Sequence, residues 1–396
     1  MATRLDLAPD MVIWEGDVRD ALREMPDNTV QCVVTSPPYL GLRDYGVAGQ
    51  IGLEPTVEEY VVVMVEVFRE VRRVLRPDGT LWLNLGDSYN GSGGAGGDYG
   101  PGGLRDGQPR YPGRRLNGLK PKDLIGVPWR VAFALQTDGW YLRSDIIWAK
   151  PNPMPESVTD RPTKSHEYVF LLSKSPQYFY DADAIREPHQ DPRVVDGRYQ
   201  GSGTNRPDYV PNTQGFRSGG KGIVMKHRDY NPAGRNRRTV WTIPTQPFPE
   251  AHFATFPEEL PRLCILAGTS PMACPHCGAP WRRVVERYRT LDGERVVDLP
   301  AMRSTDKSRP SSAQGVAHHR TGSASETIGW QPTCSCDGND GSGKCIVLDP
   351  FWGSGTSGKV ALELGRIAWG VELNPEYIEI SKRRLRGAQT TLLGRV

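Results

Sequence analysis

The chain has 396 residues, of which 37% are hydrophobic and 24% charged, enough for a substantial core in one or two domains. Its 44 glycines and 34 prolines follow no repeat, so a collagen-like fibre is excluded and long loops are expected. The 49 lysines and arginines barely exceed the 46 aspartates and glutamates, and this balance identifies no partner. No apolar run approaches the roughly 20 residues of a membrane helix, and the N-terminus does not read as a secretory signal, so we expect an intracellular, cytoplasmic protein.

The first part of the chain alternates predicted strands with a predicted helix. Apolar runs at 11–16, 30–36 and 80–86 are typical of strands. Between the second and third of these, Thr56 and Glu59 form a capping box that begins an amphipathic helix, and the turn sequence RPDG ends it. These elements predict the beginning of an α/β fold.

The second part continues the same alternation. Further strands are predicted at 141–150, 166–174, 345–350 and 366–373, and further helices at about 357–364 and from Asn374 onward. The glycine-rich segment 91–118 is expected to be a flexible loop. Strands that alternate with helices imply a mostly parallel sheet covered on both faces, so we predict an α/β fold with a Rossmann-like, doubly wound, seven-stranded sheet.

The motif LDPFWGSGTSGK at 348–359 places a carboxylate, several glycines and a helix start directly after a predicted strand. Glycines let the backbone approach a ligand closely, and the first turn of a helix offers free N–H groups. Glu372 ends the next predicted strand, where an acidic side chain accepts hydrogen bonds from ribose hydroxyls. The motif therefore predicts a nucleotide-like ligand.

Three interpretations of this glycine-rich turn compete. Gly353 to Lys359 matches a Walker A loop, but Val360 stands where that loop needs a hydroxyl to bind magnesium. Gly353, Gly355 and Gly358 match the spacing of a dinucleotide fingerprint. The Asp-Pro-Phe before the turn is bulky and acidic, which suits a cationic ligand better than a pyrophosphate, so we favour S-adenosylmethionine.

The motif VTSPPY at 34–39 also ends a predicted strand. Pro37 and Pro38 fix two φ angles and remove two N–H donors, so this stiff turn presents carbonyl oxygens. Ser36 adds a hydroxyl acceptor and Tyr39 an aromatic ring, a set that suits a planar heterocycle carrying an amino group. An isolated Pro-Pro-Tyr would rather be a rigid loop, but the strand before it and the second motif favour a site.

Together, VTSPPY and LDPFWGSGT resemble the amino-methylating DNA methyltransferases, the N4-cytosine/N6-adenine family, in the permuted beta arrangement with the catalytic motif first and the cofactor motif last. The resemblance covers about 1–90, 120–180, 246–273 and 345–396. It implies the fold of an S-adenosylmethionine-dependent methyltransferase in a bacterial or phage-encoded protein that acts on double-stranded DNA. A homodimer and a cognate restriction endonuclease are further candidate partners.

The resemblance also implies the residues of the site. The implied catalytic residues are Ser36, Pro37, Pro38 and Tyr39. The implied cofactor-binding residues are Asp17, Phe256, Pro257, Asp349, Phe351, Gly353, Gly355, Thr356 and Glu372. Within this set, Asp17 would contact the adenine amino group and Glu372 the ribose.

The predicted chemistry follows from where a DNA base lies. An amino group paired inside a duplex cannot reach a cofactor, so the base is expected to be flipped into the pocket. Ser36 and the Pro37 carbonyl would accept both amino hydrogens and direct the nitrogen at the sulfonium methyl, without a covalent enzyme intermediate. Within the resemblance, Ser-Pro-Pro-Tyr goes mostly with cytosine N4 and Asp- or Asn-Pro-Pro-Tyr with adenine N6. We therefore predict cytosine N4, with adenine N6 as the alternative.

Basic residues concentrate at 186–240, which holds eleven lysines and arginines against five acidic residues. Aromatic residues interleave with them, as in segments that stack on bases, although charge alone would equally suit a solvated loop. The expected DNA contacts are Arg217, Lys221, Lys226, Arg228, Arg235, Arg237 and Arg238. We assign target recognition to 181–245. An RNA base or a protein amide is an alternative acceptor, and a non-catalytic, nucleotide-binding DNA regulator is the alternative from another class.

Seven cysteines, an odd number, argue against a disulfide framework. Cys-Pro-His-Cys-Gly has the spacing of a zinc knuckle, and a later Cys-Ser-Cys would complete four ligands, although reduced surface cysteines are the alternative. The candidate ligands are Cys274, Cys277, Cys334 and Cys336, with His276, His318 and His319 as substitutes. We predict that 274–341 is an insertion held by structural zinc, with 295–330 polar enough to be disordered. The methyltransferase domain then has a catalytic half, 1–180, and a cofactor-binding half, 246–273 with 342–396.

Overall fold

The computed structural model describes residues 2–42, 44–91, 116–188, 234–246, 256–291, 294–296 and 321–393. They belong to two compact units. Unit 1 comprises Met1–Ala184, Arg238–Arg282 and Trp330–Val396, and unit 2 comprises Ile185–Arg237 and Arg283–Gly329. Within the described ranges, every helix is too short or too polar to cross a membrane.

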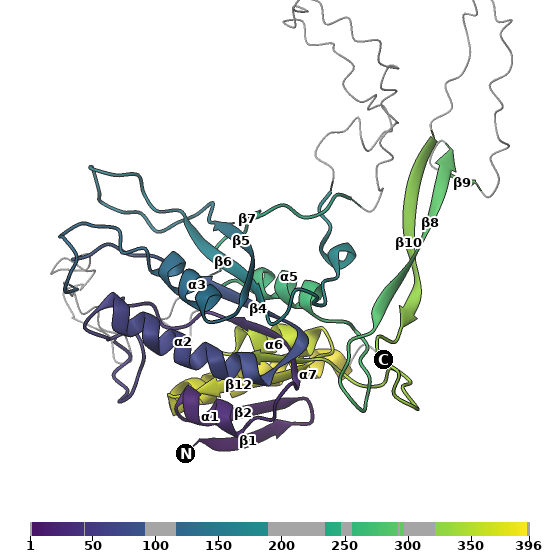
Figure 1. Ribbon diagram of the computed structural model, residues 1–396, viewed down its shortest axis with the longest axis horizontal. Helices are drawn as coiled ribbons and strands as arrows, with labels where there is room; N and C mark the ends of the chain where they lie inside the picture. The colour runs from purple at the N-terminus through teal and green to yellow at the C-terminus, as the bar shows by residue number, and fades with distance from the viewer. Residues whose placement is uncertain are drawn as a thin grey trace, which may run out of the picture. The chain divides into compact units, whose positions relative to one another are not determined.

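The described part of unit 1 is built on a nine-stranded sheet with the order β1-β2-β12-β11-β3-β4-β6-β5-β7 (Figure 1). The strands are β1 (Thr3–Ala8), β2 (Met11–Glu15), β3 (Val30–Thr35), β4 (Leu75–Leu85), β5 (Tyr141–Ala149), β6 (His166–Ser173), β7 (Val240–Thr242), β11 (Ile346–Asp349) and β12 (Ile367–Glu372). Neighbours from β2 to β4 run parallel, and β6 is antiparallel to both β4 and β5. The predicted α/β class with a doubly wound sheet is confirmed.

All seven strands predicted from the sequence are present, and β1 and β7 extend the sheet at its two edges. The apolar pattern does not indicate these two because β1 is largely exposed and β7 has only three residues. The helix before β4 ends at Val74, as RPDG predicts. The strand already begins at Leu75, so RPDG lies inside β4, where its register against β3 shifts between Val30 and Cys32.

Two groups of helices cover the two faces of this sheet (Figure 1). One group is α1 (Val18–Glu24), α2 (Val57–Val74) and α3 (Val127–Thr137), and the other is α5 (Glu259–Gly268), α6 (Thr356–Glu363) and α7 (Pro375–Leu393). Side chains alternate along β4 as in any strand: Leu81 and Leu83 join the core beneath the first group, whereas Trp82 between them faces Gly268 of α5. The predicted capping box of α2 is confirmed, since Thr56 and Glu59 exchange side chain-to-backbone bonds of 3.1 and 3.2 Å.

A second sheet has the order β10-β8-β9. Its strands are β8 (Arg282–Leu291), β9 (Glu294–Val296) and β10 (Thr321–Gln331). The disorder predicted for 295–330 is therefore wrong for the residues of β9 and β10. Composition misled the prediction because paired strands satisfy their backbone hydrogen bonds with each other, even where few large apolar side chains are buried.

Two predicted segments lie largely outside the described residues. Of the loop 91–118, only the ends are described, and the Leu116 N–H donates to Asn90 Oδ1 at 2.8 Å. Of the target-recognition region 181–245, residues 189–233 are outside. Among the expected DNA contacts, those outside are Arg217, Lys221, Lys226 and Arg228.

Candidate active site

The carboxyl ends of the central parallel strands open into one cavity of about 870 Å³. This volume lies within the range of about 300–1,000 Å³ that small-molecule sites occupy. Ser36 to Tyr39 line it directly after β3, and Asp349 to Ser354 line it from the last residue of β11 onward. Because β3 and β11 are parallel neighbours, their carboxyl ends lie at the same edge of the sheet. The topology therefore brings the two sequence motifs to one site.

A hydrogen bond joins the two motifs. Thr35, the residue before Ser36, donates from Oγ1 to Asp349 Oδ1 at 2.7 Å, across 314 positions of sequence. Ser357 Oγ on α6 donates to Asp349 Oδ2 at 2.7 Å, and the Phe351 N–H donates to Oδ1 at 3.1 Å. Burial raises the pKa of Asp349 to about 7, an effect that these donors oppose. Asp349 thus ties together the ends of β3 and β11 and the start of α6.

The glycine-rich turn has an open side and a packed side. Gly353 has a φ of +53°, and a Cβ at this position would meet no atom within 4 Å, so its backbone is accessible from the cavity. Gly355 is the N-cap of α6 with a φ of +76°. A Cβ at Gly358 or Gly370 would lie 1.9 or 2.1 Å from the Trp352 ring. The last glycine of the fingerprint-like spacing is thus required by the packing of Trp352.

Two further carboxylates line the cavity beside this turn. Glu372, at the end of β12, accepts from the N–H of Gly353 at 2.7 Å and of Asn374 at 2.8 Å. Burial raises the pKa of Glu372 to about 7. Asp17 is the N-cap of α1, and its ion pair with Arg19 at 2.7 Å lowers the pKa of Asp17. Carboxylates placed around an open backbone turn can accept hydrogen bonds from hydroxyl and amino groups.

Tyr39 is the centre of a hydrogen-bond network at another part of the cavity. Ser36 Oγ donates to Tyr39 Oη at 3.1 Å, and Tyr39 Oη donates to Glu167 Oε2 at 2.7 Å. Asn84 Nδ2 donates to the same Glu167 oxygen at 3.1 Å, and Lys150 pairs with the other. Burial raises the pKa of Tyr39 well above its ordinary value, and the Glu167 charge adds to this shift. The hydroxyl therefore keeps its proton and acts as a donor.

Close packing holds the proline turn in place. The Tyr60 hydroxyl on α2 donates to the Pro38 carbonyl at 2.9 Å. A Cβ at Gly86 would lie 2.5 Å from the Tyr39 ring, and a Cβ at Gly52 would lie 3.1 Å from the Tyr39 carbonyl oxygen. Larger residues at these two glycines would displace the turn, so the orientation of Tyr39 depends on its neighbours as well as on the prolines.

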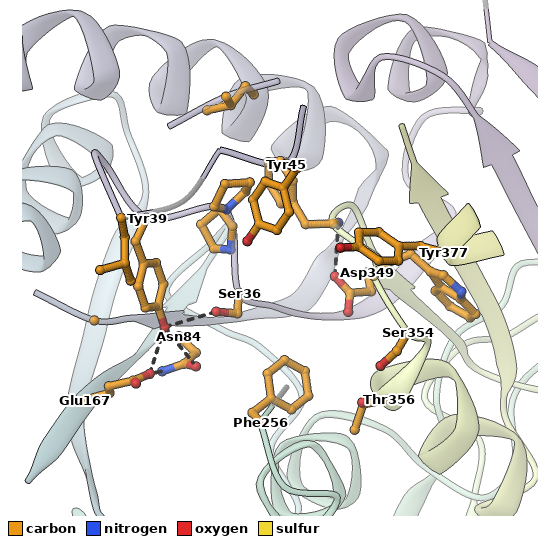
Figure 2. A pocket seen from close by; sticks show the side chains of 18 of the residues that line it. Ser36, Tyr39, Tyr45, Asn84, Glu167, Phe256, Asp349, Ser354, Thr356 and Tyr377 are labelled. Carbon is orange, nitrogen blue, oxygen red and sulfur yellow. Dashed lines mark hydrogen bonds between the residues drawn. The ribbon is translucent and has the colours of Figure 1, made fainter. Parts of the chain in front are cut away.

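Figure 2 shows two ends of the cavity. The proline end holds Ser36, Tyr39, Asn84 and Glu167, and the glycine end holds Asp349, Ser354, Thr356 and Tyr377. Lys150 belongs to the proline end through its bond to Glu167, and Glu372 to the glycine end through its bond to Gly353. Asp17 lines the cavity after β2, which pairs with β12. Phe256 lies between the two labelled groups in this view, and the ring of Tyr377 meets that of Tyr45 edge to face at 6.4 Å. A ligand that reaches from one end to the other would pass these aromatic side chains.

All four residues predicted for catalysis line this cavity, as do seven of the nine predicted for the cofactor. The other two are Gly355, the N-cap of α6, and Pro257, whose carbonyl accepts from the Leu260 N–H at 3.1 Å. The roles assigned to these residues stay predictions. Sequence reasoning missed Asn84 and Glu167. Their only signal is a polar residue inside an otherwise apolar strand, in LWLNLG and HEYVFLL.

Three of the predicted DNA contacts lie within the described residues, namely Arg235, Arg237 and Arg238. In unit 2, Arg235 pairs with Glu187 at 2.7 Å, and the two residues also exchange backbone hydrogen bonds of 2.9 and 3.1 Å. Arg237 Nε donates to the Ile185 carbonyl at 2.8 Å. Arg235 and Arg237 therefore have bonds within the protein, and their contact with DNA stays a prediction.

The four predicted metal ligands lie together in unit 1. The Sγ atoms of Cys274, Cys277, Cys334 and Cys336 are all within 4.8 Å of one another, and none is in a disulfide. Among the described residues, His276 is not part of this group, and His318 and His319 lie outside those residues. None of the four cysteines lines the cavity of the two motifs.

Comparison with known proteins supports the assignment that the two motifs suggest. Residues 30–274 and 342–383 match the family model N6_N4_Mtase, described as DNA methylase. The chain is 40% identical over 377 residues to the Type II methyltransferase M.SmaI of Serratia marcescens. This alignment covers 93% of this chain and 89% of that protein. It is 39% identical over 388 residues to the Type II methyltransferase M.Cfr9I of Citrobacter freundii, in an alignment that covers 96% of this chain and 89% of that protein.

The fold has a counterpart among solved structures. The PvuII DNA methyltransferase (cytosine-N4-specific) aligns with a TM-score of 0.51 and 15% identity over 98% of this chain and 94% of that chain, a likeness that concerns the fold alone. The family match spans both motifs and more than half of the chain. The chain therefore belongs to the N6_N4_Mtase family of DNA methylases.

Proposed function

We propose that this DNA methyltransferase transfers the methyl group of its cofactor, S-adenosylmethionine, to N4 of a cytosine flipped out of double-stranded DNA. The observation that carries the proposal is one cavity lined by both motifs, with Thr35 bonded to Asp349 between them. Direct transfer requires donor and acceptor to be held together in one orientation, and such a cavity meets this requirement.

The glycine end of the cavity fits the cofactor. Asp349 and Glu372 are held by neutral hydroxyl and N–H donors, so their negative charge favours a ligand with a sulfonium and an ammonium group. Glu372 suits the ribose hydroxyls and Asp17 the adenine amino group. The open backbone at Gly353 leaves room for the methionine portion.

When bound, S-adenosylmethionine supplies an electrophilic methyl group. The residues of the proline end prepare the acceptor nitrogen. Because Ser36 donates its own hydrogen to Tyr39, the Ser36 oxygen can accept a hydrogen from the amino group of the base. Tyr39 donates in turn to Glu167, which fixes the direction of this relay. We assign the second amino hydrogen to the Pro37 carbonyl, and stacking on the base to the Tyr39 ring.

The choice of cytosine rests on the first residue of the proline motif. Within the family, Ser-Pro-Pro-Tyr accompanies cytosine N4 more often than adenine N6, and Ser36 occupies that place here. A neutral hydroxyl accepts a hydrogen from either amino group, so adenine N6 is the second candidate. The base must therefore be identified by its product.

Incubation of unmethylated duplex DNA with labelled S-adenosylmethionine, followed by nucleoside mass spectrometry, tests the proposal. We expect N4-methylcytosine, formed far more slowly by the Ser36→Ala variant. Detection of N6-methyladenine would instead identify adenine as the methylated base. If folded protein binds the cofactor and DNA but yields neither product, a non-catalytic regulator becomes the better description.

We further propose that 181–245 selects the target sequence and that duplex DNA is the partner of this region. Its basic and aromatic composition supports contact with phosphates and bases. Replacing Arg217 and Lys221 together by alanine should weaken binding to all duplexes and reduce its salt dependence, measured by fluorescence anisotropy at several salt concentrations. An unchanged salt dependence would remove these two residues from the interface.

A further inference from the structure

We propose that Cys274, Cys277, Cys334 and Cys336 bind one structural Zn²⁺ ion and that Asn339 orients this site from outside it. The four Sγ atoms converge within 4.8 Å from two segments of unit 1, one before β8 and one after β10. Tetrahedral zinc with Zn–S bonds of about 2.3 Å places its sulfur ligands about 3.8 Å apart. The cysteines therefore already surround a space close to the size that the ion requires.

An amide hydrogen-bond donor lies beside one of the four sulfurs. Asn339 Nδ2 lies 3.3 Å from Cys334 Sγ. A metal-bound thiolate is a better acceptor than a thiol, and a donor that bonds to a ligand from outside the site orients that ligand. The Asn339 amide is thus placed to donate to a thiolate at Cys334.

Asn339 has a fixed orientation of its own. Trp281 Nε1 donates to Asn339 Oδ1 at 3.0 Å, and the Gly341 N–H donates to the same oxygen at 3.3 Å. With its oxygen held by two donors, the amide must direct its NH₂ group at Cys334. Asn339 is therefore a positioning residue for the metal site, not a ligand.

Backbone pairing closes the site into a compact loop. Ala273 and Gly343 exchange hydrogen bonds of 2.8 and 3.0 Å, which bring the two cysteine-bearing segments together. The Gly278 N–H donates to the Cys274 carbonyl at 2.9 Å, and Gly278 has a φ of +68°, as a tight turn after the second cysteine requires. Few large apolar side chains are available in this region, so a metal ion would supply the stability that a small core cannot.

The loop is also fastened to the central sheet. Gln31, on β3, donates from Nε2 to the Gly278 carbonyl at 2.7 Å and accepts from the Ile346 N–H of β11 at 2.5 Å. Arg76 of β4 bonds to the Cys277 carbonyl. The segment that carries Cys274 and Cys277 thus contacts β3 and β4, and through Gln31 it is linked to β11. The opposite ends of β3 and β11 carry the catalytic and cofactor motifs. Because the cysteines do not line that cavity, we assign zinc a structural role.

Metal analysis of the full-length protein, purified under reducing conditions without chelators, tests the zinc assignment. We expect elemental mass spectrometry to find one zinc per chain in the wild type and less than about a tenth of that zinc content in Cys334→Ser. The matched control is Cys264→Ala, which removes a buried cysteine outside the group and should keep one zinc. Wild-type protein without zinc after reconstitution, with iron in its place, or with a disulfide among the four cysteines would overturn the proposal.

Two measurements separate the site from a general folding defect. Asn339→Ala keeps all four ligands, and we expect its zinc affinity to fall about 10–100-fold in competition with a chromophoric chelator, while its circular dichroism is unchanged. Removal of zinc from the wild type should speed hydrogen exchange at 273–281 and 333–343 but not in α2. Unchanged zinc affinity in Asn339→Ala would contradict its role, and unchanged exchange at those two segments would contradict the structural role of zinc.

Discussion

The two ends of the active-site cavity hold their carboxylates in different ways. At the glycine end, Asp349 and Glu372 accept from hydroxyls and backbone N–H groups within the described chain, and burial raises both pKa values to about 7. At the proline end, Glu167 is paired with the cation of Lys150 and also accepts from Tyr39. When Asp349 and Glu372 are ionised, no cationic side chain among the described residues is paired with them, whereas the charge of Glu167 is paired with Lys150.

This difference matches the two molecules that the proposed reaction brings together in the cavity. A methyl donor with a sulfonium is positively charged, and a buried carboxylate without a cationic partner favours it. A flipped cytosine or adenine is neutral and needs oriented acceptors more than charge. The comparison therefore predicts that variants at the glycine end alter mainly cofactor binding, whereas variants at the proline end alter mainly the transfer step.

The largest effect is expected at Ser36. Ser36→Ala removes the oxygen assigned to the amino hydrogen, and we expect single-turnover methyl transfer to slow by about 10²–10³-fold with unchanged cofactor affinity in calorimetry. Tyr39→Phe keeps the ring but removes the hydroxyl that orients Ser36, so it should lose less. Equal losses in transfer and in cofactor affinity for Ser36→Ala would contradict the division of roles between the two ends.

At the glycine end, Glu372→Gln removes one negative charge with little change in shape. A glutamine has a single acceptor oxygen, so the N–H of Gly353 or of Asn374 also loses its partner. Hydrogen bonds to charged groups contribute about 1.5–3 kcal/mol, and we therefore expect the cofactor Kd to rise about 10–100-fold. The matched control is Glu363→Gln on α6, which lies outside the cavity and should bind as the wild type does. A lower transfer rate at saturating cofactor, with unchanged Kd, would reverse the assignment.

The sequence predicts much of the fold because local patterns specify it. The buried parallel strands are continuous apolar runs, and α2 carries both its cap and its apolar face. The two additional edge strands, β1 and β7, lack such patterns because an edge strand is half exposed or very short. Their place in the sheet depends on neighbours, which a single sequence does not reveal.

The residues of the candidate site also divide into those that local sequence motifs predict and those that depend on tertiary neighbours. Both motifs are local in sequence, so their residues are predicted by number, and their shared cavity follows from parallel strand topology. Glu167 is different: it reaches Tyr39 only because β6 runs antiparallel beside β4, across 128 positions of sequence. A polar residue in an apolar strand indicates that it has a hydrogen-bond partner, but the sequence does not show which residue that partner is. Gly358 completes a dinucleotide-like spacing in the sequence, but only the structure shows why a glycine is needed there: a Cβ would lie 1.9 Å from the Trp352 ring.

A smaller effect on transfer is expected from Glu167→Gln. The glutamine can still accept from Tyr39, but Lys150, whose side chain is 18% exposed, loses its counter-charge. We expect transfer to slow about tenfold and the free energy of unfolding to fall by about 1–3 kcal/mol. In the double variant Glu167→Gln with Lys150→Met, denaturant unfolding should recover much of the stability, while transfer should stay slow. Full recovery of transfer would assign Glu167 to charge compensation alone.

The smallest effect is a pH dependence, and it concerns the glycine end only. In the unliganded protein Asp349 and Glu372 keep their protons up to a pKa of about 7, whereas their ordinary pKa values are 3.8 and 4.5. Between about pH 4.5 and 7 the folded state therefore binds more protons than the unfolded chain, and the stability of the unliganded protein should fall as the pH rises through this window. Chemical denaturation at several pH values, with Glu372→Gln as the flatter comparison, measures this slope.

The affinity for a cationic ligand should change with pH in the opposite direction to the stability of the unliganded protein. It favours the ionised carboxylates, so the affinity for S-adenosylmethionine should rise as the pH rises from 6 to 8, by up to about tenfold for each carboxylate that must lose a proton. S-adenosylhomocysteine has the same ribose, adenine and amino acid groups without the sulfonium charge. The ratio of the two affinities removes the titration of those shared groups and should increase with pH. A constant ratio would mean that the buried carboxylates do not sense the sulfonium, and the contrast between the two ends of the cavity would then be one of hydrogen bonding rather than of charge.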